Sequence, residues 1–137
     1  MSTSDVERLR RLAAYEAIFT SDDFSVGAWD DRTSRKDGVI EMPSFRYSSA
    51  MNRFVDEMYR LDWVVSFDWP QWAASPEGRR LLSDPEAIGS ASAEDLARII
   101  TTIVREERLA EGALADAFER GVLTAIARRA GELARER

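Results

Sequence analysis

Four charged residues are of the types that acid–base catalysis on an anionic substrate requires. Arg105 and Arg108 could clamp the anion, because a guanidinium group makes paired hydrogen bonds to carboxylate and phosphate. Asp68 or Glu111 could then act as general base, provided that a cleft perturbs its pKa. The alternative interpretation is an ion-pair network that caps helix ends and sets the angle between two helices. That network would consist of Arg105, Glu106, Glu107, Arg108 and Glu111. We predict the network and assign no catalytic residue.

The residue types that the chain lacks exclude most catalytic and metal chemistry. It contains no cysteine and no histidine, which removes disulfides, thiolate nucleophiles, cysteine-based metal sites and every serine–histidine–aspartate triad. A metal site would need carboxylates alone, and the unopposed acidic stretch lacks the spacing of a calcium-binding loop. That stretch consists of Asp22, Asp23, Asp30 and Asp31. No glycine-rich phosphate-binding motif occurs. We therefore predict no metal and no cofactor.

Three of the four tryptophans lie close together, in the segment 63–72. One interpretation is that these indoles close one end of a helical core. The other is a docking surface, since exposed tryptophan and arginine side chains dominate many protein interfaces. We assign Trp63 and Phe67 to the core. The interface anchors that we predict lie at a turn stiffened by proline, and they are Asp68, Trp69 and Trp72.

A second candidate is the polar segment from Thr20 to Gly38. It is rich in serine, aspartate, glycine and threonine, and Phe24 and Trp29 are among its few apolar residues. A loop of this length is uncommon unless it is functional or disordered. We predict an ordered surface loop in which Trp29 is a further interface candidate.

Composition predicts one globular domain over residues 1–137. The chain has 137 residues, of which 45% are apolar and 32% are charged, enough for one genuine core. No run approaches the roughly 20 apolar residues of a membrane span, and the N-terminus lacks the apolar region of a signal peptide. We expect a cytoplasmic, acidic protein without membrane contact. The net charge of −6 disfavours direct binding to nucleic acid, whose phosphates require a basic surface.

Apolar periodicity predicts a mainly α fold, a compact multi-helix domain. Long helices are expected over 5–19, 49–61 and 93–107, with two short helices between the last two and two more before the C-terminus. The residues expected to cap helix starts are Ser4, Ser75, Asp84 and Ser92. Two β-prone runs, 39–42 and 63–67, are expected to pair as a small two-stranded β-ribbon, with Phe45 and Tyr47 extending the first.

Three motifs resemble a prokaryotic family of small stand-alone domains of unknown function. They are Phe67-Asp68-Trp69 with Trp72, the run from Ile103 to Gly112, and the run from Ala117 to Leu123. The likeness covers the chain from about Gly38 onward. One departure is Leu109, where the family pattern has an aromatic residue. The resemblance implies a prokaryotic or phage source and supplies no activity.

These observations favour a non-enzymatic protein–protein interaction module whose partner is another protein. One concrete form would be a regulator or inhibitor in phage–host conflict, of the anti-restriction or anti-CRISPR type. The alternative is a small hydrolase or transferase that uses carboxylates and arginine on an anionic substrate. A homodimer formed through the Ile99–Ile103 face or the terminal helix is a further alternative.

Overall fold

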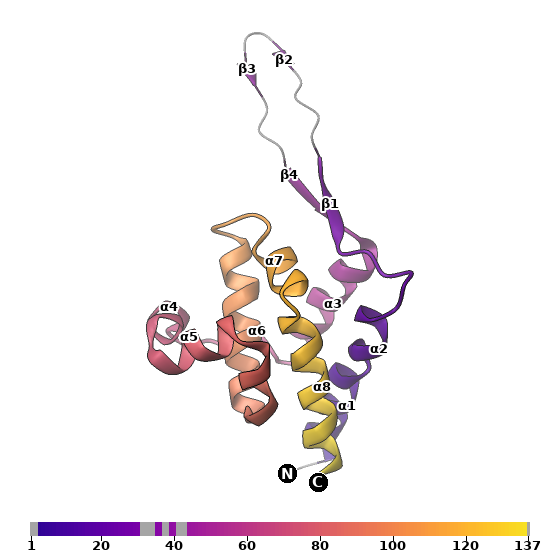
Figure 1. Cartoon of the computed structure of the whole chain (residues 1–137), viewed down its shortest axis with the longest axis vertical. Coiled ribbons are helices and arrows are strands. Elements are labelled where there is room, and N and C mark those ends of the chain that lie inside the picture. The colour runs from indigo at the N-terminus through magenta and orange to yellow at the C-terminus, as the bar shows by residue number, and fades with distance from the viewer. Residues whose placement is uncertain (1–2, 31–34, 37–38, 41–43, 137) are drawn as a thin grey trace.

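A computed structural model describes residues 3–30, 35–36, 39–40 and 44–136 of the chain. The described residues form eight α-helices, one 3-10 helix and four short strands (Figure 1). The mainly α fold with a small β-ribbon is therefore confirmed. The helices are α1 (Thr3–Ala13), α2 (Tyr15–Phe19), α3 (Ser49–Arg60), α4 (Trp69–Ala74), α5 (Pro76–Ser83), η1 (Pro85–Ser90), α6 (Ala93–Glu107), α7 (Ala113–Glu119) and α8 (Val122–Arg135). The strands are β1 (Gly27–Asp30), β2 (Arg35–Lys36), β3 (Val39–Ile40) and β4 (Ser44–Tyr47).

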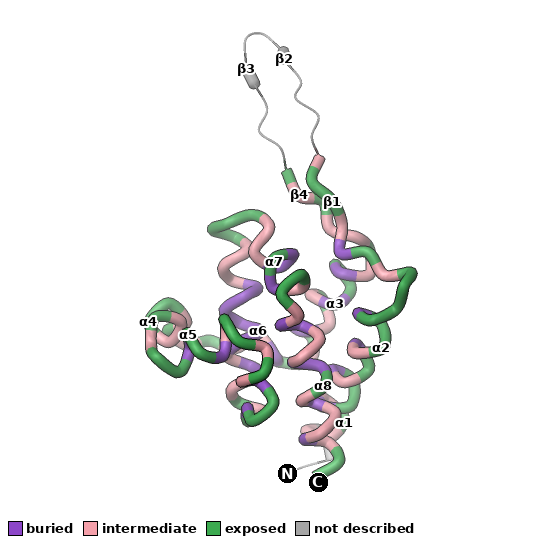
Figure 2. Tube along the Cα trace, viewed as in Figure 1, coloured by how far each residue is buried: buried purple, intermediate pink, exposed green. Residues whose placement is uncertain are grey.

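The apolar stripes of the helices face one another and form the core. Helix α8 packs along α1 and also contacts α2, α7 and η1, while α6 contacts α4, α5, α7 and α8. Buried residues gather where these helices meet (Figure 2). The predicted stripe of α6 is buried, and it consists of Leu96, Ile99, Ile100, Ile103 and Val104. Because Ile99 and Ile103 are only 0% and 3% exposed, the Ile99–Ile103 face packs inside the chain and offers no dimer surface.

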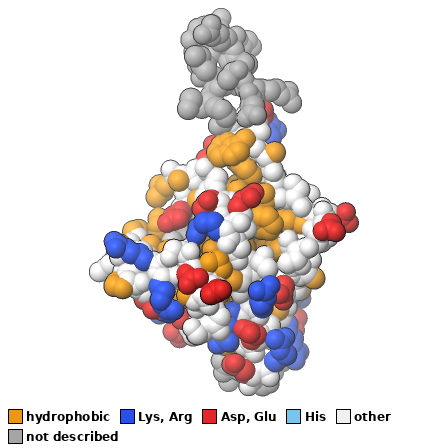
Figure 3. All heavy atoms as spheres, viewed as in Figure 1, with side chains coloured by type: hydrophobic (Ala, Val, Ile, Leu, Met, Phe, Trp, Pro, Cys, Tyr) orange, Lys and Arg blue, Asp and Glu red, His pale blue; other side chains and the backbone are white. Residues whose placement is uncertain are grey.

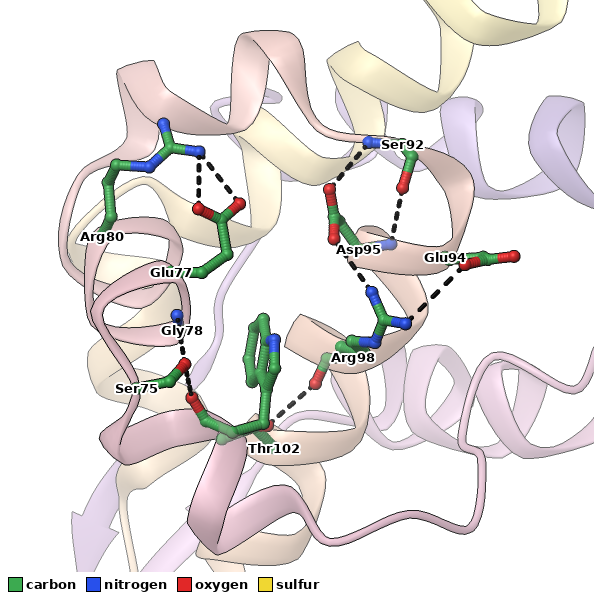
Figure 4. Close-up of polar contacts among 10 residues, drawn as sticks. Ser75, Glu77, Gly78, Arg80, Ser92, Glu94, Asp95, Arg98 and Thr102 are labelled. Atoms are coloured by element: carbon green, nitrogen blue, oxygen red, sulfur yellow. Dashed lines mark hydrogen bonds and ion pairs between the residues drawn. The ribbon is translucent and has the colours of Figure 1, made fainter.

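Capping side chains start the middle helices where the sequence predicts them (Figure 4). Ser75 Oγ accepts the N–H of Gly78 at 3.1 Å at the start of α5. At the start of α6, Ser92 Oγ accepts the N–H of Asp95 at 3.1 Å, and the Asp95 carboxylate accepts the N–H of Ser92 at 3.1 Å. This reciprocal pair satisfies two helix-end donors, and such caps each stabilise a helix by about 1 kcal/mol.

The N-terminal helix differs from the prediction in two places. It begins at Thr3, so Ser4 lies inside α1 and is not the residue that precedes it. It is also interrupted at Ala14, after which α2 continues the chain. Helix α2 turns Tyr15 and Phe19 onto Phe54 of α3, with ring centroids 4.9 and 5.2 Å apart. Helix α2 thus packs against α3 through aromatic rings, and it also contacts α8.

The strand pairing predicted between 39–42 and 63–67 is wrong. Strand β1 pairs with β4 in antiparallel register, Gly27 opposite Tyr47 and Asp30 opposite Ser44, and β2 pairs with β3. β1 thus lies within the segment predicted as a loop, and Glu41 and Met42 lie outside the described residues. Strands close in sequence pair more readily because a shorter loop must be closed. We call the four strands the β-arm; it extends from the helical body (Figure 1).

The segment 63–67 pairs with no strand among the described residues and is held by helix α6 instead. The buried hydroxyl of Thr101 accepts the N–H of Val65 at 2.9 Å and donates to the carbonyl of Trp63 at 3.3 Å. Trp63 is 1% exposed, which confirms its assignment to the core. Its ring lies 4.3 Å from the guanidinium carbon of Arg8, whose Nε donates to the Leu61 carbonyl at 2.7 Å.

Candidate functional site

The anchors predicted around Asp68 lie on helix α4. The Asp68 carboxylate is exposed and accepts the N–H of Gln71 at 3.3 Å, so it serves as the N-cap of this helix. Trp72 is half-buried against the core, with its ring 6.2 Å from that of Phe67. Trp69 is also half-buried. Neither of these two indoles is among the large apolar side chains that the helical body exposes.

The charged cluster near the end of α6 is not an ion-pair network. Within the part of the chain that the structure describes, Arg105, Glu106, Glu107, Arg108 and Glu111 form no ion pair with one another. Arg108 instead donates to the hydroxyl of Tyr59 at 3.1 Å, and Glu111 accepts the N–H of Phe45 at 2.8 Å. Phe45 belongs to β4, which lies apart from α4 and its cap Asp68 (Figure 1). Asp68 and Glu111 therefore do not share one site.

Glu107, alone among the described residues of the charged cluster near the end of α6, has the helix-capping role that we predict for that cluster. Its carboxylate accepts the N–H of Gly112 at 3.1 Å and that of Leu114 at 2.9 Å, two donors at the start of α7. It also accepts the hydroxyl proton of Tyr47 from β4. The Tyr47 oxygen in turn accepts the N–H of Ala115 at 3.1 Å. One carboxylate and one phenol thus join the β-arm to the α6–α7 loop, and we call these two side chains the arm clamp.

The arm clamp is partly buried, and this decides its electrostatics. Burial, followed by the hydrogen bond to Glu107, raises the pKa of Tyr47 above its ordinary value of 10.0. The phenol therefore stays neutral and keeps its donor proton. Sequence reasoning missed this pair because Tyr47 and Glu107 are 60 residues apart. Gly112, whose φ is 96°, indicates the turn between α6 and α7 but gives no sign of the contact between Tyr47 and Glu107.

Trp29 stands at the base of the β-arm beside this clamp. Its side chain is 50% exposed, and its ring meets that of Phe45 edge to face at a centroid distance of 5.2 Å. The indole also lies close to Gly112, where an added Cβ would be 3.0 Å from Cζ2 of Trp29. Position 112 therefore favours glycine for two reasons: the backbone is left-handed there, and the indole of Trp29 comes close to where a Cβ would be. The indole is held from two sides while half of its surface faces solvent.

A groove of about 450 Å³ runs beside Trp29, between β1 and α7. It is lined by Val26, Gly27, Ala28, Trp29, Phe45, Gly112, Ala115, Asp116 and Glu119. Asp116 pairs with Arg120 at 2.8 Å, whereas Glu119 has no ion-pair or hydrogen-bond partner for its side chain among the described residues. Figure 3 shows apolar side chains just below the grey atoms of the arm and acidic side chains next to them. We call these nine residues the arm-base groove.

Two loop residues extend the apolar and acidic character of this surface. Leu109, in the α6–α7 loop that also carries Gly112, is 79% exposed. Glu111 is exposed in the same loop and binds β4 through the Phe45 amide. Of the predicted site residues, Trp29 and Glu111 are therefore brought to one surface. Asp68, Trp69 and Trp72 lie on another, and Arg105 contacts no charged partner within the described ranges.

No metal centre takes shape in the described part of the chain. No group of three carboxylates lies close enough to hold a metal ion among the residues with assigned positions. Burial raises the pKa of Glu106, with Arg120 lowering it in opposition, but Glu106 does not line the arm-base groove. No described helix is long and apolar enough to cross a membrane.

Comparison with known protein families gives a match over nearly the whole chain. The profile of a family described as a family of unknown function (DUF6508) matches residues 4–136. No curated protein and no solved structure matches the chain. The resemblance seen in the motifs around Asp68 and Gly112 is thereby confirmed, and it extends over nearly the whole chain.

Proposed function

We propose that this chain, which belongs to the family of unknown function DUF6508, is a non-enzymatic protein–protein interaction module that binds its partner at the base of the β-arm. The contact surface would consist of the arm-base groove together with Leu109 and Glu111. The observation that carries the proposal is the half-exposed Trp29, packed against Phe45 and Gly112 and supported by the arm clamp.

Exposure of so large an apolar side chain needs a reason. An indole buries roughly 150–250 Å² when it is covered, and tryptophan is among the commonest energetic anchors of protein interfaces. Leu109, at 79% exposure, adds a second apolar side chain nearby in the α6–α7 loop. Contiguous exposed apolar side chains with a polar rim are typical of docking surfaces.

The way in which Trp29 is held also supports binding. The ring is confined by Phe45 and Gly112, and β4 is tied to the helical body by Glu107 and Glu111. An anchor that is already ordered loses less conformational freedom when a partner covers it, which favours affinity. By contrast, Asp68, Arg108 and Glu111, which were considered for catalysis, each take part in a separate hydrogen bond.

Site-specific photo-crosslinking in the native host tests this function. A photoreactive phenylalanine at Leu109 should give a crosslinked partner band, because this side chain is exposed in the loop that also carries the groove residue Gly112. The same label at Arg10, an exposed position on α1, serves as the matched control and should give none. Trp29→Ala should remove the Leu109 product while the protein stays folded. A band of equal strength from Arg10, or one insensitive to Trp29→Ala, would contradict the proposal.

A further inference from the structure

We infer that the arm-base groove receives a basic, extended segment of the partner protein, with an arginine side chain placed between Trp29 and Glu119. This inference rests on the function proposed above and specifies the chemistry of the partner. Its evidence is the charge of the groove lining, the position of Trp29 within that lining and the outer edge of β1, which pairs with no strand among the described residues.

The charge of the groove is acidic and incompletely balanced. Asp116 and Glu119 are its charged lining residues, and no cationic side chain lines it among the described residues. Arg120 compensates Asp116 at 2.8 Å, which leaves Glu119 uncompensated. Glu111 adds a further exposed carboxylate in the adjoining loop. A cationic partner gains from this arrangement, whereas an acidic peptide or a nucleic-acid backbone is repelled.

The neighbouring indole selects the type of cation. Trp29 and Glu119 line the same groove, and we expect one extended ligand side chain to contact both. Tryptophan is the aromatic residue that binds cations most strongly. A guanidinium group suits the pair best, because it stacks on an aromatic ring and still donates in-plane hydrogen bonds to a carboxylate.

The backbone of β1 explains why the segment should be extended. The N–H of Phe45 points to Glu111, away from β1, so Phe45 and the opposite Trp29 form a non-hydrogen-bonded pair of the ladder. The N–H and carbonyl of Trp29 therefore point away from β4, along the outer edge of β1. Residues 26–29 supply four of the nine groove-lining residues, so β1 contributes most of the strand side of the groove. An exposed strand edge is a recognised acceptor of an added peptide strand.

The test is an NMR titration of the full chain with a short capped peptide that alternates threonine and arginine. Two matched peptides carry citrulline or glutamate in place of arginine; citrulline keeps the shape and removes the charge. We expect the indole N–H signal of Trp29, assigned with Trp29→Phe, and the amide of Glu119 to shift with the arginine peptide. Citrulline should weaken binding at least about threefold, and the glutamate peptide should not bind.

Substitutions in the chain sharpen the result. Trp29→Ala should weaken binding of the arginine peptide about tenfold, and Glu119→Gln about threefold. Glu94→Gln removes the same charge from an exposed position at the start of α6 and should leave binding unchanged. Shifts of equal size with citrulline, an unshifted Trp29 signal, or equal weakening by Glu94→Gln would overturn the inference.

The two proposals fail in different ways. If Leu109 crosslinks a partner in a Trp29-dependent manner but the arginine peptide leaves Trp29 unshifted, the interaction function stands and the basic partner is wrong. If the peptide binds as expected but no Trp29-dependent crosslink forms in the host, the groove chemistry stands and the interaction function is wrong.

Discussion

Replacing Tyr47 by phenylalanine should weaken the attachment of the arm to the helical body. The change removes the hydroxyl that donates to Glu107 and accepts the N–H of Ala115 at 3.1 Å. A hydrogen bond to a charged group contributes about 1.5–3 kcal/mol, and a neutral one about 0.5–1.5 kcal/mol. Because the Ala115 amide would be left without its partner in a partly buried place, we expect a loss of about 2–4 kcal/mol in unfolding free energy.

Tyr59→Phe is the matched control for this prediction. Its hydroxyl also has one charged partner, since Arg108 donates to it at 3.1 Å, but the pair is exposed to solvent. Exposed interactions of charged groups contribute about 0–1 kcal/mol, so Tyr59→Phe should lower the unfolding free energy by less than about 1 kcal/mol. Both variants lose one oxygen atom from the same residue type. The difference between their losses in unfolding free energy therefore measures what the burial of Tyr47 and its second hydrogen bond contribute.

Urea unfolding of both variants, followed by circular dichroism, measures the two free energies. Amide hydrogen exchange provides the local readout, because the N–H groups of Ala115 and Phe45 should exchange faster in Tyr47→Phe than in the parent chain. A double-mutant cycle with Glu107→Gln should show coupling, since the two side chains are in direct contact. Equal losses for Tyr47→Phe and Tyr59→Phe, with no coupling to Glu107, would refute the arm clamp.

Three further predictions concern the helical body. Thr101→Val should lower the unfolding free energy, measured in urea, by about 1–3 kcal/mol, because the amide of Val65 loses its hydrogen-bond partner. The neighbouring Thr102→Val should lower it by less, because the Thr102 hydroxyl donates to a carbonyl of its own helix. Equal losses for the two variants would contradict this prediction. Glu106→Gln should raise unfolding free energy at pH 7, because burial raises the pKa of the carboxyl and disfavours its charged form; a decrease would be the opposite result. Burial and the Glu57 carboxylate raise the pKa of Tyr15 from 10.0 to about 12, so the stability that the neutral phenol contributes below pH 10 should be lost as the pH rises from 10 to 12. In Tyr15→Phe the melting temperature should fall less steeply over that pH range than in the parent chain. An equally steep fall in both proteins would contradict the assignment.

Local features of the fold could be predicted from the sequence because they depend on neighbours within a few residues. Ser75 and Ser92 cap helices through donors three residues ahead, and the α6 stripe repeats with the period of one helix. The absence of cysteine and histidine likewise restricts the chemistry without any structure. The mainly α class followed from these signals alone.

Strand pairing and the exposure of tryptophans could not be predicted in the same way. The run 63–67 has high β propensity, yet its backbone is satisfied by Thr101, 36 residues beyond Val65. β propensity measures how well a side chain fits a sheet, and it does not say whether a partner strand is present. The same limit applies to the indoles: Trp63 is buried and Trp29 is half exposed, although both are tryptophans near β-prone residues.

The sequence by itself determined a helical domain with well-placed caps and no histidine or thiol chemistry. Tertiary structure alone decided the candidate site, because it is assembled from side chains and backbone groups far apart in the chain. Tyr47 meets Glu107 across 60 residues, and the Phe45 amide meets Glu111 across 66. Such contacts depend on how α6 and α7 pack against the arm, and no periodicity or spacing within a single segment encodes that packing. The same packing holds Trp29 against Gly112 and leaves half of the indole in solvent.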